Sequence, residues 1–423
     1  MISKKLLRKG SIFLLANVLN ASIPFLLLPI LTRVLSPEDY GVIAMFTVFL
    51  SFVGAFVGLS VHGAVSVNYF KMTEERFSEF ISSSLILLIV SAVGGLAVVG
   101  MLGRFLEELI GLPYKWMLIA ILVSFFQFIL NIQLTVWVVK GEAVRYGVAQ
   151  VSQTFLNAFG SLFLIFIVGM LWEGRLIGQS ITVIFFGIIS LLLLYKSGLL
   201  RRPSRLQVDV ADALKFGVPL IPHAIGAFAI HSTDRVVIAN ILDVAMVGIY
   251  MVAMQLGQAI SLLCDSFNKV YSPWLMESLG GQQVDKIKLV NNSYMAMCVF
   301  ILVGLTWAAV ATFLLPYIAG DKFEGARDLI LIMCVAFSFT GLYYVVANFI
   351  FYSKDTRYLA LVTFFCGFIN APLTYLLVKH YALLGAAYSF LIVQILFFLI
   401  TWCLSSRVYP MPWFYFLKRR SHA

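Results

Sequence analysis

The feature that most constrains this chain is a succession of apolar runs, each long enough to cross a lipid bilayer. Twelve such runs can be placed between residues 11 and 405, separated by short polar segments. About 20 residues at 1.5 Å per residue cross a hydrocarbon core of roughly 30 Å. Backbone N–H and C=O groups find no water in that core, so each run must form a helix. The sequence therefore predicts an all-α integral membrane protein with twelve transmembrane helices.

The composition agrees with this prediction and excludes a soluble domain. Hydrophobic residues make up 61% of the 423 residues and charged residues only 12%, whereas a soluble domain carries about 25% charged residues. The five cysteines lie inside the apolar runs without CxxC or Cys/His spacing, so we expect neither a metal site nor disulfides. Neither a GxxxxGK[ST] nor an HExxH motif occurs, and we expect no cofactor and no enzymatic activity.

The distribution of positive charge predicts the orientation of the chain. When the loops are numbered alternately, 22 of the 30 lysines and arginines fall on the side of the two termini. Cytoplasmic loops of membrane proteins carry such an excess of Lys and Arg. We therefore expect both termini in the cytoplasm. The formal charge of +10 then reflects membrane anchoring rather than binding of nucleic acid.

The longest loop is basic and divides the chain nearly in half. We expect an N-terminal six-helix lobe, a cytoplasmic linker and a C-terminal six-helix lobe. Their ranges are 1–200, 201–213 and 214–423.

The two halves carry similar sequence features. A shift of 207 residues places Leu35 on Leu242 and Gly41 on Gly248. An even number of helices per half makes the two repeats parallel, related by an axis along the membrane normal. Transporters built in this way bind their substrate at the interface of the repeats and move one lobe against the other.

Two phrases of the sequence carry a family resemblance. LLPILTRVLSPEDYGVIAMF lies at the end of the first apolar run, and STDRVVIANILDVAMVGIYMVAMQL joins the seventh run to the eighth. Both resemble the matching stretches of Wzx-type polysaccharide flippases and echo the wider multidrug/oligosaccharidyl-lipid/polysaccharide exporter superfamily. The resemblance implies the MATE-like exporter fold, with two parallel six-helix lobes.

The resemblance also implies a function. The cargo would be an undecaprenyl-diphosphate-linked oligosaccharide, such as an O-antigen repeat unit of lipopolysaccharide. It would pass from the cytoplasmic to the periplasmic leaflet of a bacterial inner membrane by alternating access coupled to an ion gradient, as in an antiporter. Expected partners are this lipid-linked oligosaccharide, membrane lipids, and polymerase and other glycan-assembly proteins. A drug/cation exporter of the same superfamily and a membrane glycan polymerase or ligase are the alternatives.

Polar side chains inside the apolar runs are costly in lipid and mark candidate sites. In the eighth run, spacings of 3, 7 and 4 put four of them on one helical face. They are Gln255, Gln258, Asp265 and Lys269. Lys269 could bind a diphosphate, and the alternative is a salt bridge with Asp265 one turn earlier.

The fifth run carries a second polar stripe, which begins after Arg145. Its members are Gln150, Gln153, Asn157 and Ser161. Amides and hydroxyls can bind sugars, but they also join membrane helices. We expect Arg145, Gln150 and Gln153 to contact substrate, with Glu142 as a loop partner of Arg145, and the other two to join helices. Further candidates of the same kind are Asn17, Asn20, Gln127 and Asn131.

A set of titratable residues is predicted to act in ion coupling or gating. Asp234 and Arg235 interrupt the seventh run, where the alternative is a charge pair that caps the helix and fixes its depth. His62 and His231 could exchange protons near neutral pH, or could be ordinary buried polar groups. Asp265 completes this set.

Overall fold

The structure is a computed structural model that describes residues 4–280, 285–353 and 357–415. These ranges contain thirteen α-helices, two short 3₁₀ helices and no strand. The helices are α1 (Lys4–Val34), α2 (Pro37–Gly58), α3 (Val61–Tyr69), α4 (Glu74–Ile110), α5 (Tyr114–Val139), α6 (Ala143–Phe166), α7 (Trp172–Lys196), α8 (Leu206–Gly217), η1 (Val218–Leu220), α9 (Ile221–Ile241), α10 (Val244–Leu279), α11 (Lys286–Ala319), η2 (Asp321–Ala326), α12 (Arg327–Ser353) and α13 (Arg357–Val408).

The number of membrane-spanning helices agrees with the sequence. In the described ranges, eleven helical segments are long and apolar enough to cross a membrane. One of them belongs to α13, which covers 52 residues and is broken at Ala382, where φ is 47° and ψ is −132°. The two sides of this break supply two spans, so the prediction of an all-α membrane protein with twelve spans is confirmed.

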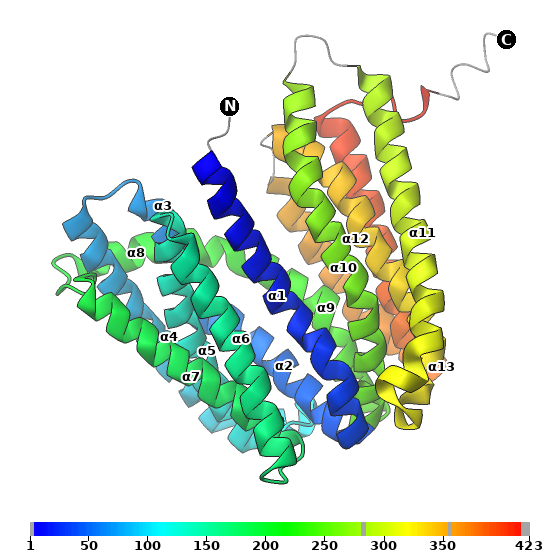
Figure 1. Cartoon of the computed structure of the whole chain (residues 1–423), viewed down its shortest axis with the longest axis horizontal. Coiled ribbons are helices and arrows are strands. Elements are labelled where there is room, and N and C mark those ends of the chain that lie inside the picture. Colours follow the sequence, from blue (N-terminus) through cyan, green and yellow to red (C-terminus); the bar gives the residue numbers. More distant parts are fainter. Residues whose placement is uncertain (1–3, 281–284, 354–356, 416–423) are drawn as a thin grey trace. The chain divides into compact units, whose positions relative to one another are not determined.

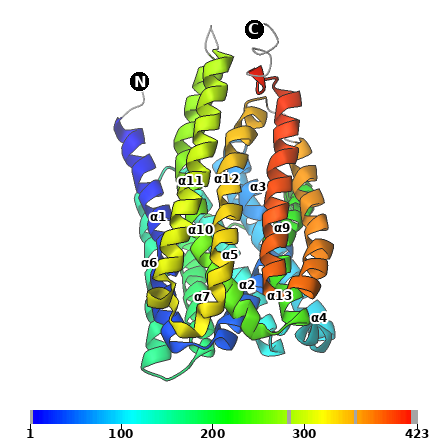
Figure 2. The ribbon, with the colours of Figure 1, turned by 90° about the vertical axis from the view of Figure 1, so that its right-hand side faces the viewer.

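The chain forms two compact units. The first contains the residues up to Phe228 together with Asp243–Gly248, and the second contains Ala229–Leu242 and the residues from Ile249 onward. In the first unit, α6 packs along α1 and α7 (Figure 1). In the second unit, α12 packs against both α11 and α13 (Figure 2). Eight of the thirteen residues that the sequence suggested as a linker, 206–213, are helical, because α8 begins at Leu206.

The repeated phrases of the sequence are two helix starts of the same design. Before α2, the hydroxyl of Ser36 accepts a hydrogen bond from the Asp39 N–H at 3.1 Å, and the Asp39 carboxylate accepts one from the Ser36 N–H at 2.9 Å. Before α10, the carboxylate of Asp243 accepts from the Met246 N–H at 2.7 Å. Side-chain acceptors of this kind satisfy the free N–H groups of a first turn. Ser36 and Asp243 are 207 residues apart, the offset that the repeat predicts.

These two helix starts pack against each other within the first unit. A Cβ atom added to Gly41 would lie 1.9 Å from the backbone oxygen of Val244, and one added to Gly248 would lie 1.9 Å from the backbone oxygen of Pro37. Gly41 faces Val244, four positions before Gly248, and Gly248 faces Pro37, four positions before Gly41. Only a residue without a side chain fits at either position, which explains why the repeat retains glycine there.

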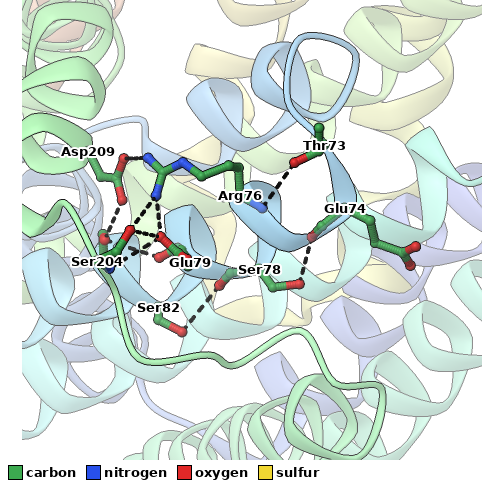
Figure 3. Close-up of polar contacts among 9 residues, drawn as sticks. Thr73, Glu74, Arg76, Ser78, Glu79, Ser82, Ser204 and Asp209 are labelled. Carbon is green, nitrogen blue, oxygen red and sulfur yellow. Dashed lines mark hydrogen bonds and ion pairs between the residues drawn. The ribbon is translucent and has the colours of Figure 1, made fainter.

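Helix α8 is fixed to the first unit by a cluster of charged and hydroxyl side chains (Figure 3). Arg76 of α4 forms ion pairs with Glu79 and with Asp209 of α8, the latter at 2.7 Å. Asp209 is 2% exposed and also accepts a hydrogen bond from Ser83 at 3.0 Å. Ser204 donates its hydroxyl to Glu79 at 2.5 Å. The start of α8 is thus joined to α4 by several interactions that share Arg76.

Replacing Arg76 by alanine is expected to lower the stability of the protein by about 3 kcal/mol, because Asp209 would remain buried without its cation. Arg201→Ala is the matched control, since its pair with Glu75 is exposed on both sides and such pairs contribute little. Thermal unfolding in detergent measures both variants. Equal melting temperatures for the two would show that the cluster does not hold α8.

Candidate functional site

The polar stripe on α6 is hydrogen-bonded to α1. The hydroxyl of Tyr146 donates to Asn17 Oδ1 at 3.0 Å and accepts from Gln150 Nε2 at 3.2 Å. One turn further on, the Thr154 hydroxyl donates to Asn20 Oδ1. Tyr146 and Thr154, which bind the two asparagines of the first apolar run, were not among the predicted stripe residues; Gln150, which was, binds Tyr146.

A second branch of the network joins α6 to α5. Gln153 Nε2 donates to Gln127 Oε1 at 3.4 Å, and Gln127 Nε2 donates to Asn131 Oδ1 at 3.1 Å. The Gln153, Gln127 and Asn131 side chains are all half-buried. They retain donors and acceptors that these bonds do not use.

The stripe ends at an arginine that is not one of the predicted site residues. Arg175, in the first turn of α7, donates from Nη1 to Asn157 Oδ1 at 2.5 Å and to Ser161 Oγ at 2.8 Å. Its side chain is half-buried, and no acidic side chain of the described ranges forms an ion pair with it. Among the described residues, this cation therefore has neutral hydrogen-bond partners and no acidic ion-pair partner. Asn157 and Ser161 do join helices, as predicted, and they do so by binding this cation.

Arg175 directly precedes an apolar run, so the sequence alone does not distinguish it from a loop residue. The helix begins earlier, at Trp172, which places Arg175 one turn inside α7. The spacing of Asn157 and Ser161 on α6 could have indicated that a cation faces them, since both present oxygen acceptors on the same face.

Arg145 lies at the other end of α6 and is 69% exposed. Its Nη1 forms an ion pair with Glu142 Oε2 at 2.7 Å, which confirms Glu142 as its loop partner. Contact between Arg145 and a substrate stays a prediction.

In the second unit, the polar face of α10 packs against α12. Asp265 accepts a hydrogen bond from the Tyr344 hydroxyl at 2.5 Å, and Asn348 Nδ2 donates to Asn268 Oδ1 at 2.7 Å. Lys269 is exposed and has no ion-pair partner among the described residues. The alternative of a salt bridge between Asp265 and Lys269 is therefore wrong, because Tyr344 binds the carboxylate instead.

The two glutamines of the same face differ in their surroundings. Gln255 is 8% exposed, whereas Gln258 is exposed. The spacing that placed them together defines a direction around the helix axis. This spacing does not determine which neighbouring helix, if any, buries each residue on that face.

Asp234 and Arg235 are both buried, with exposed fractions of 1% and 7%. Asp234 accepts hydrogen bonds from the Tyr250 hydroxyl and from the Arg235 backbone N–H, the latter at 2.9 Å. The Arg235 side chain forms no ion pair with Asp234, and its Nε has no hydrogen-bond partner in the described ranges. The interpretation of these neighbours as a charge pair at a helix end is wrong, because α9 continues to Ile241 and the carboxylate binds a tyrosine.

The two candidate histidines lie beside aromatic rings. The ring of His62 on α3 lies 6.1 Å from that of Phe128, and the ring of His231 on α9 lies 6.0 Å from that of Phe390, measured between centroids. In the described ranges neither histidine is hydrogen-bonded to a carboxylate. Their roles in ion coupling stay predictions.

Comparison with known proteins identifies the family. A family model described as polysaccharide biosynthesis protein matches residues 6–279, more than half of the chain. The chain belongs to the polysaccharide biosynthesis protein family. This family member is 25% identical over 405 residues to an Lsg locus protein of Haemophilus influenzae, and the match covers 93% of this chain and 98% of that protein. The expected resemblance to polysaccharide exporters is thereby confirmed.

Solved structures show the fold of this family member. An inward-facing multidrug resistance MATE family transporter of the MOP superfamily superposes with a TM-score of 0.71 at 14% identity, covering 92% of this chain and 95% of that one. The lipid II flippase MurJ, in an inward closed conformation, gives 0.74 at 14% identity, covering 93% and 86%. The MATE-like exporter fold expected from the sequence is confirmed.

Proposed function

We propose that this protein is a flippase for an undecaprenyl-diphosphate-linked oligosaccharide, such as an O-antigen or related repeat unit, and not an enzyme. It lies in a bacterial inner membrane with both termini in the cytoplasm and moves its cargo to the periplasmic leaflet by alternating access. The observation that carries the proposal is the stripe on α6, a row of amides and hydroxyls that ends at Arg175.

The chemistry of this stripe suits a sugar attached to an anion. Amide and hydroxyl groups both donate and accept hydrogen bonds, as the hydroxyls of an oligosaccharide do. A guanidinium binds phosphate or carboxylate oxygens through paired N–H groups. Arg175 lies in the first turn of α7, near the end of a membrane span, and is held there by the oxygen atoms of Asn157 and Ser161. No acidic side chain in the described part of the chain forms an ion pair with Arg175, and an anionic cargo would provide a counter-ion.

The remaining predicted residues extend the proposal to the second unit. Lys269, Gln255 and Gln258 on α10, together with Arg145 in the first unit, would contact the same cargo. Asp234, Arg235, Asp265, His62 and His231 would couple transport to an ion gradient or gate it. One charge moved through 100 mV supplies about 2.3 kcal/mol, which is enough to bias a change between two conformations.

The second candidate function is export of a drug or another organic cation. It is favoured by the carboxylates of Asp234 and Asp265, which lie within membrane-spanning helices of the second unit. Each of these carboxylates already accepts a hydrogen bond from a tyrosine, Tyr250 or Tyr344. The stripe on α6 contains no carboxylate, and for this reason we prefer the anionic cargo.

Deletion of the gene tests the proposal in the cell. Lipid-linked repeat units are expected to accumulate on the cytoplasmic side, surface glycan is expected to be lost, and the wild-type gene is expected to restore both. Normal glycan in the deletion strain, together with impaired efflux of cationic dyes, would support the exporter instead. New glycosidic bonds made by the purified protein would support a polymerase or ligase. A flippase would instead work beside a separate polymerase and other glycan-assembly proteins.

A further inference from the structure

A small polar pocket of about 220 Å³ lies between α3 and α8 in the first unit. Its polar lining comes from two lysines, one asparagine and one aspartate, and its apolar lining includes a valine and a phenylalanine. These residues are Asn68, Lys71, Asp212, Lys215, Val67 and Phe216. None of them belongs to the α6 stripe, and the proposed transport function does not use them.

The pocket carries a net positive charge. Lys71 and Lys215 are exposed, and neither forms an ion pair with any residue of the described ranges. The single carboxylate, Asp212, is bound by the buried Asn68, whose Nδ2 donates to Oδ2 at 2.8 Å. Two ammonium groups therefore stand beside one carboxylate that a neutral amide already holds.

The walls of the pocket are held in place from both ends of α8. At its end, a Cβ atom on Gly217 would lie 1.9 Å from the backbone oxygen of Leu59, so the two backbones are in direct contact. Phe216 packs against α3, with its ring 2.7 Å from the Cβ position of Gly63. At its start, α8 is fixed by Asp209 and Arg76. A pocket between two helices joined in this way is formed before any ligand binds, which reduces the entropy lost on binding.

The rim of the pocket is apolar. Val67 and Phe216 are 38% and 36% exposed, and Phe70, next to Lys71, is 75% exposed. Cations beside exposed apolar side chains match the region where lipid headgroups meet hydrocarbon. Basic pockets between membrane helices bind the headgroups of anionic lipids.

From this combination we infer that the pocket between α3 and α8 binds the phosphate group of a membrane lipid, held by the ammonium groups of Lys71 and Lys215. The phosphate could belong to an anionic phospholipid or to a prenyl diphosphate. In either case the bound lipid would stabilise α8, the helix that begins within the connection between the two halves of the sequence. This inference does not depend on transport, because the pocket would bind lipid whatever cargo the protein carries.

The test measures the melting temperature of the purified full-length protein in detergent while lipids are added. Phosphatidylglycerol is compared with phosphatidylcholine of the same chains, farnesyl diphosphate and inorganic diphosphate. We expect phosphatidylglycerol or farnesyl diphosphate to raise the melting temperature, and the zwitterionic lipid and inorganic diphosphate to leave it unchanged. Whichever of the two active lipids acts at the lower concentration identifies the source of the phosphate.

Paired variants connect the effect to the pocket. Lys71→Met/Lys215→Met keeps the apolar stems and should weaken the apparent lipid affinity about 30-fold, given about tenfold or less for each charge near a membrane surface. Lys71→Arg/Lys215→Arg should retain it. Lys140→Met/Lys196→Met is the matched control, because Lys140 follows α5 and Lys196 ends α7, and both lie outside the pocket.

Lysines near helix C-termini also stabilise the helix dipole, and the same variants separate this role from binding. A purely structural role predicts a lower melting temperature without lipid and an unchanged response to lipid in the double methionine variant. That result would overturn the inference, as would an equal loss of response in the control pair. A response to inorganic diphosphate as large as that to either lipid would overturn the assignment to a lipid.

Discussion

Replacing Arg175 by alanine is expected to reduce transport of lipid-linked oligosaccharide at least tenfold while the protein still folds and enters the membrane. The variant removes the cation at the end of the α6 stripe and frees Asn157 and Ser161. Hydrogen bonds to charged groups contribute about 1.5–3 kcal/mol, and each 1.4 kcal/mol corresponds to a factor of ten. Complementation of the deletion strain, with surface glycan measured at equal protein levels, reads out the effect.

Two companion variants make the result for Arg175 interpretable. Arg175→Lys keeps the charge but loses the paired N–H geometry, and it should restore transport in part. Lys115→Ala removes a nearby cation, whose exposed pair with Glu173 lies at the start of the same helix α7, and it should transport normally. Full activity of Arg175→Ala would contradict the assignment. If Arg175→Gln transports as well as Arg175→Lys does, the role of Arg175 is hydrogen bonding and does not require its charge.

Alanine at Gly41 or at Gly248 is expected to lower stability strongly and to a similar degree. In each case the new Cβ would lie 1.9 Å from a backbone oxygen, of Val244 or of Pro37. A backbone oxygen cannot rotate away as a side chain can, so the helix starts must separate. Overpacking of this kind costs about 1–3 kcal/mol and occasionally more. The similarity of the two effects follows from the repeat, since the two contacts are related by the 207-residue offset.

The controls for this prediction are Gly100→Ala and Gly160→Ala. Nothing lies within 4 Å of a Cβ at either position, and alanine within a helix is more stable than glycine by about 0.5–1 kcal/mol. The melting temperature in detergent should therefore fall for Gly41→Ala and Gly248→Ala and rise slightly for the two control variants. A melting temperature that falls by the same amount in all four would show that the crossing of α2 and α10 is not close.

The arrangement along the chain could be predicted from the sequence because it depends on local properties. Apolar length predicts the spans, and the 207-residue offset predicts that the stretch around Gly41 corresponds to the stretch around Gly248. The polar face of α6 also follows from local spacing, since residues three and four apart share a side of a helix. Each of these features was found where the sequence placed it.

The partners of these polar residues could not be predicted in the same way. Asn20 and Thr154 are 134 residues apart, and Asp265 and Tyr344 are 79 apart. Spacing along one helix suggested Lys269 as the partner of Asp265, but a tyrosine of another helix binds that carboxylate. The contacts of Arg175 could not be predicted for a related reason, because they depend on which face of α6 packs against the start of α7.

The central claim is that this protein moves a lipid-linked oligosaccharide across a bilayer, and reconstitution tests it most directly. Purified protein is placed in liposomes with a labelled undecaprenyl-diphosphate-linked repeat unit, and the exposure of the sugar to an added glycosidase is followed over time. We expect the wild-type protein to move the sugar between leaflets far faster than empty liposomes do, and Arg175→Ala to move it at least tenfold more slowly than wild type. A wild-type rate equal to that of empty liposomes under an ion gradient, with cationic dyes transported instead, would contradict the account.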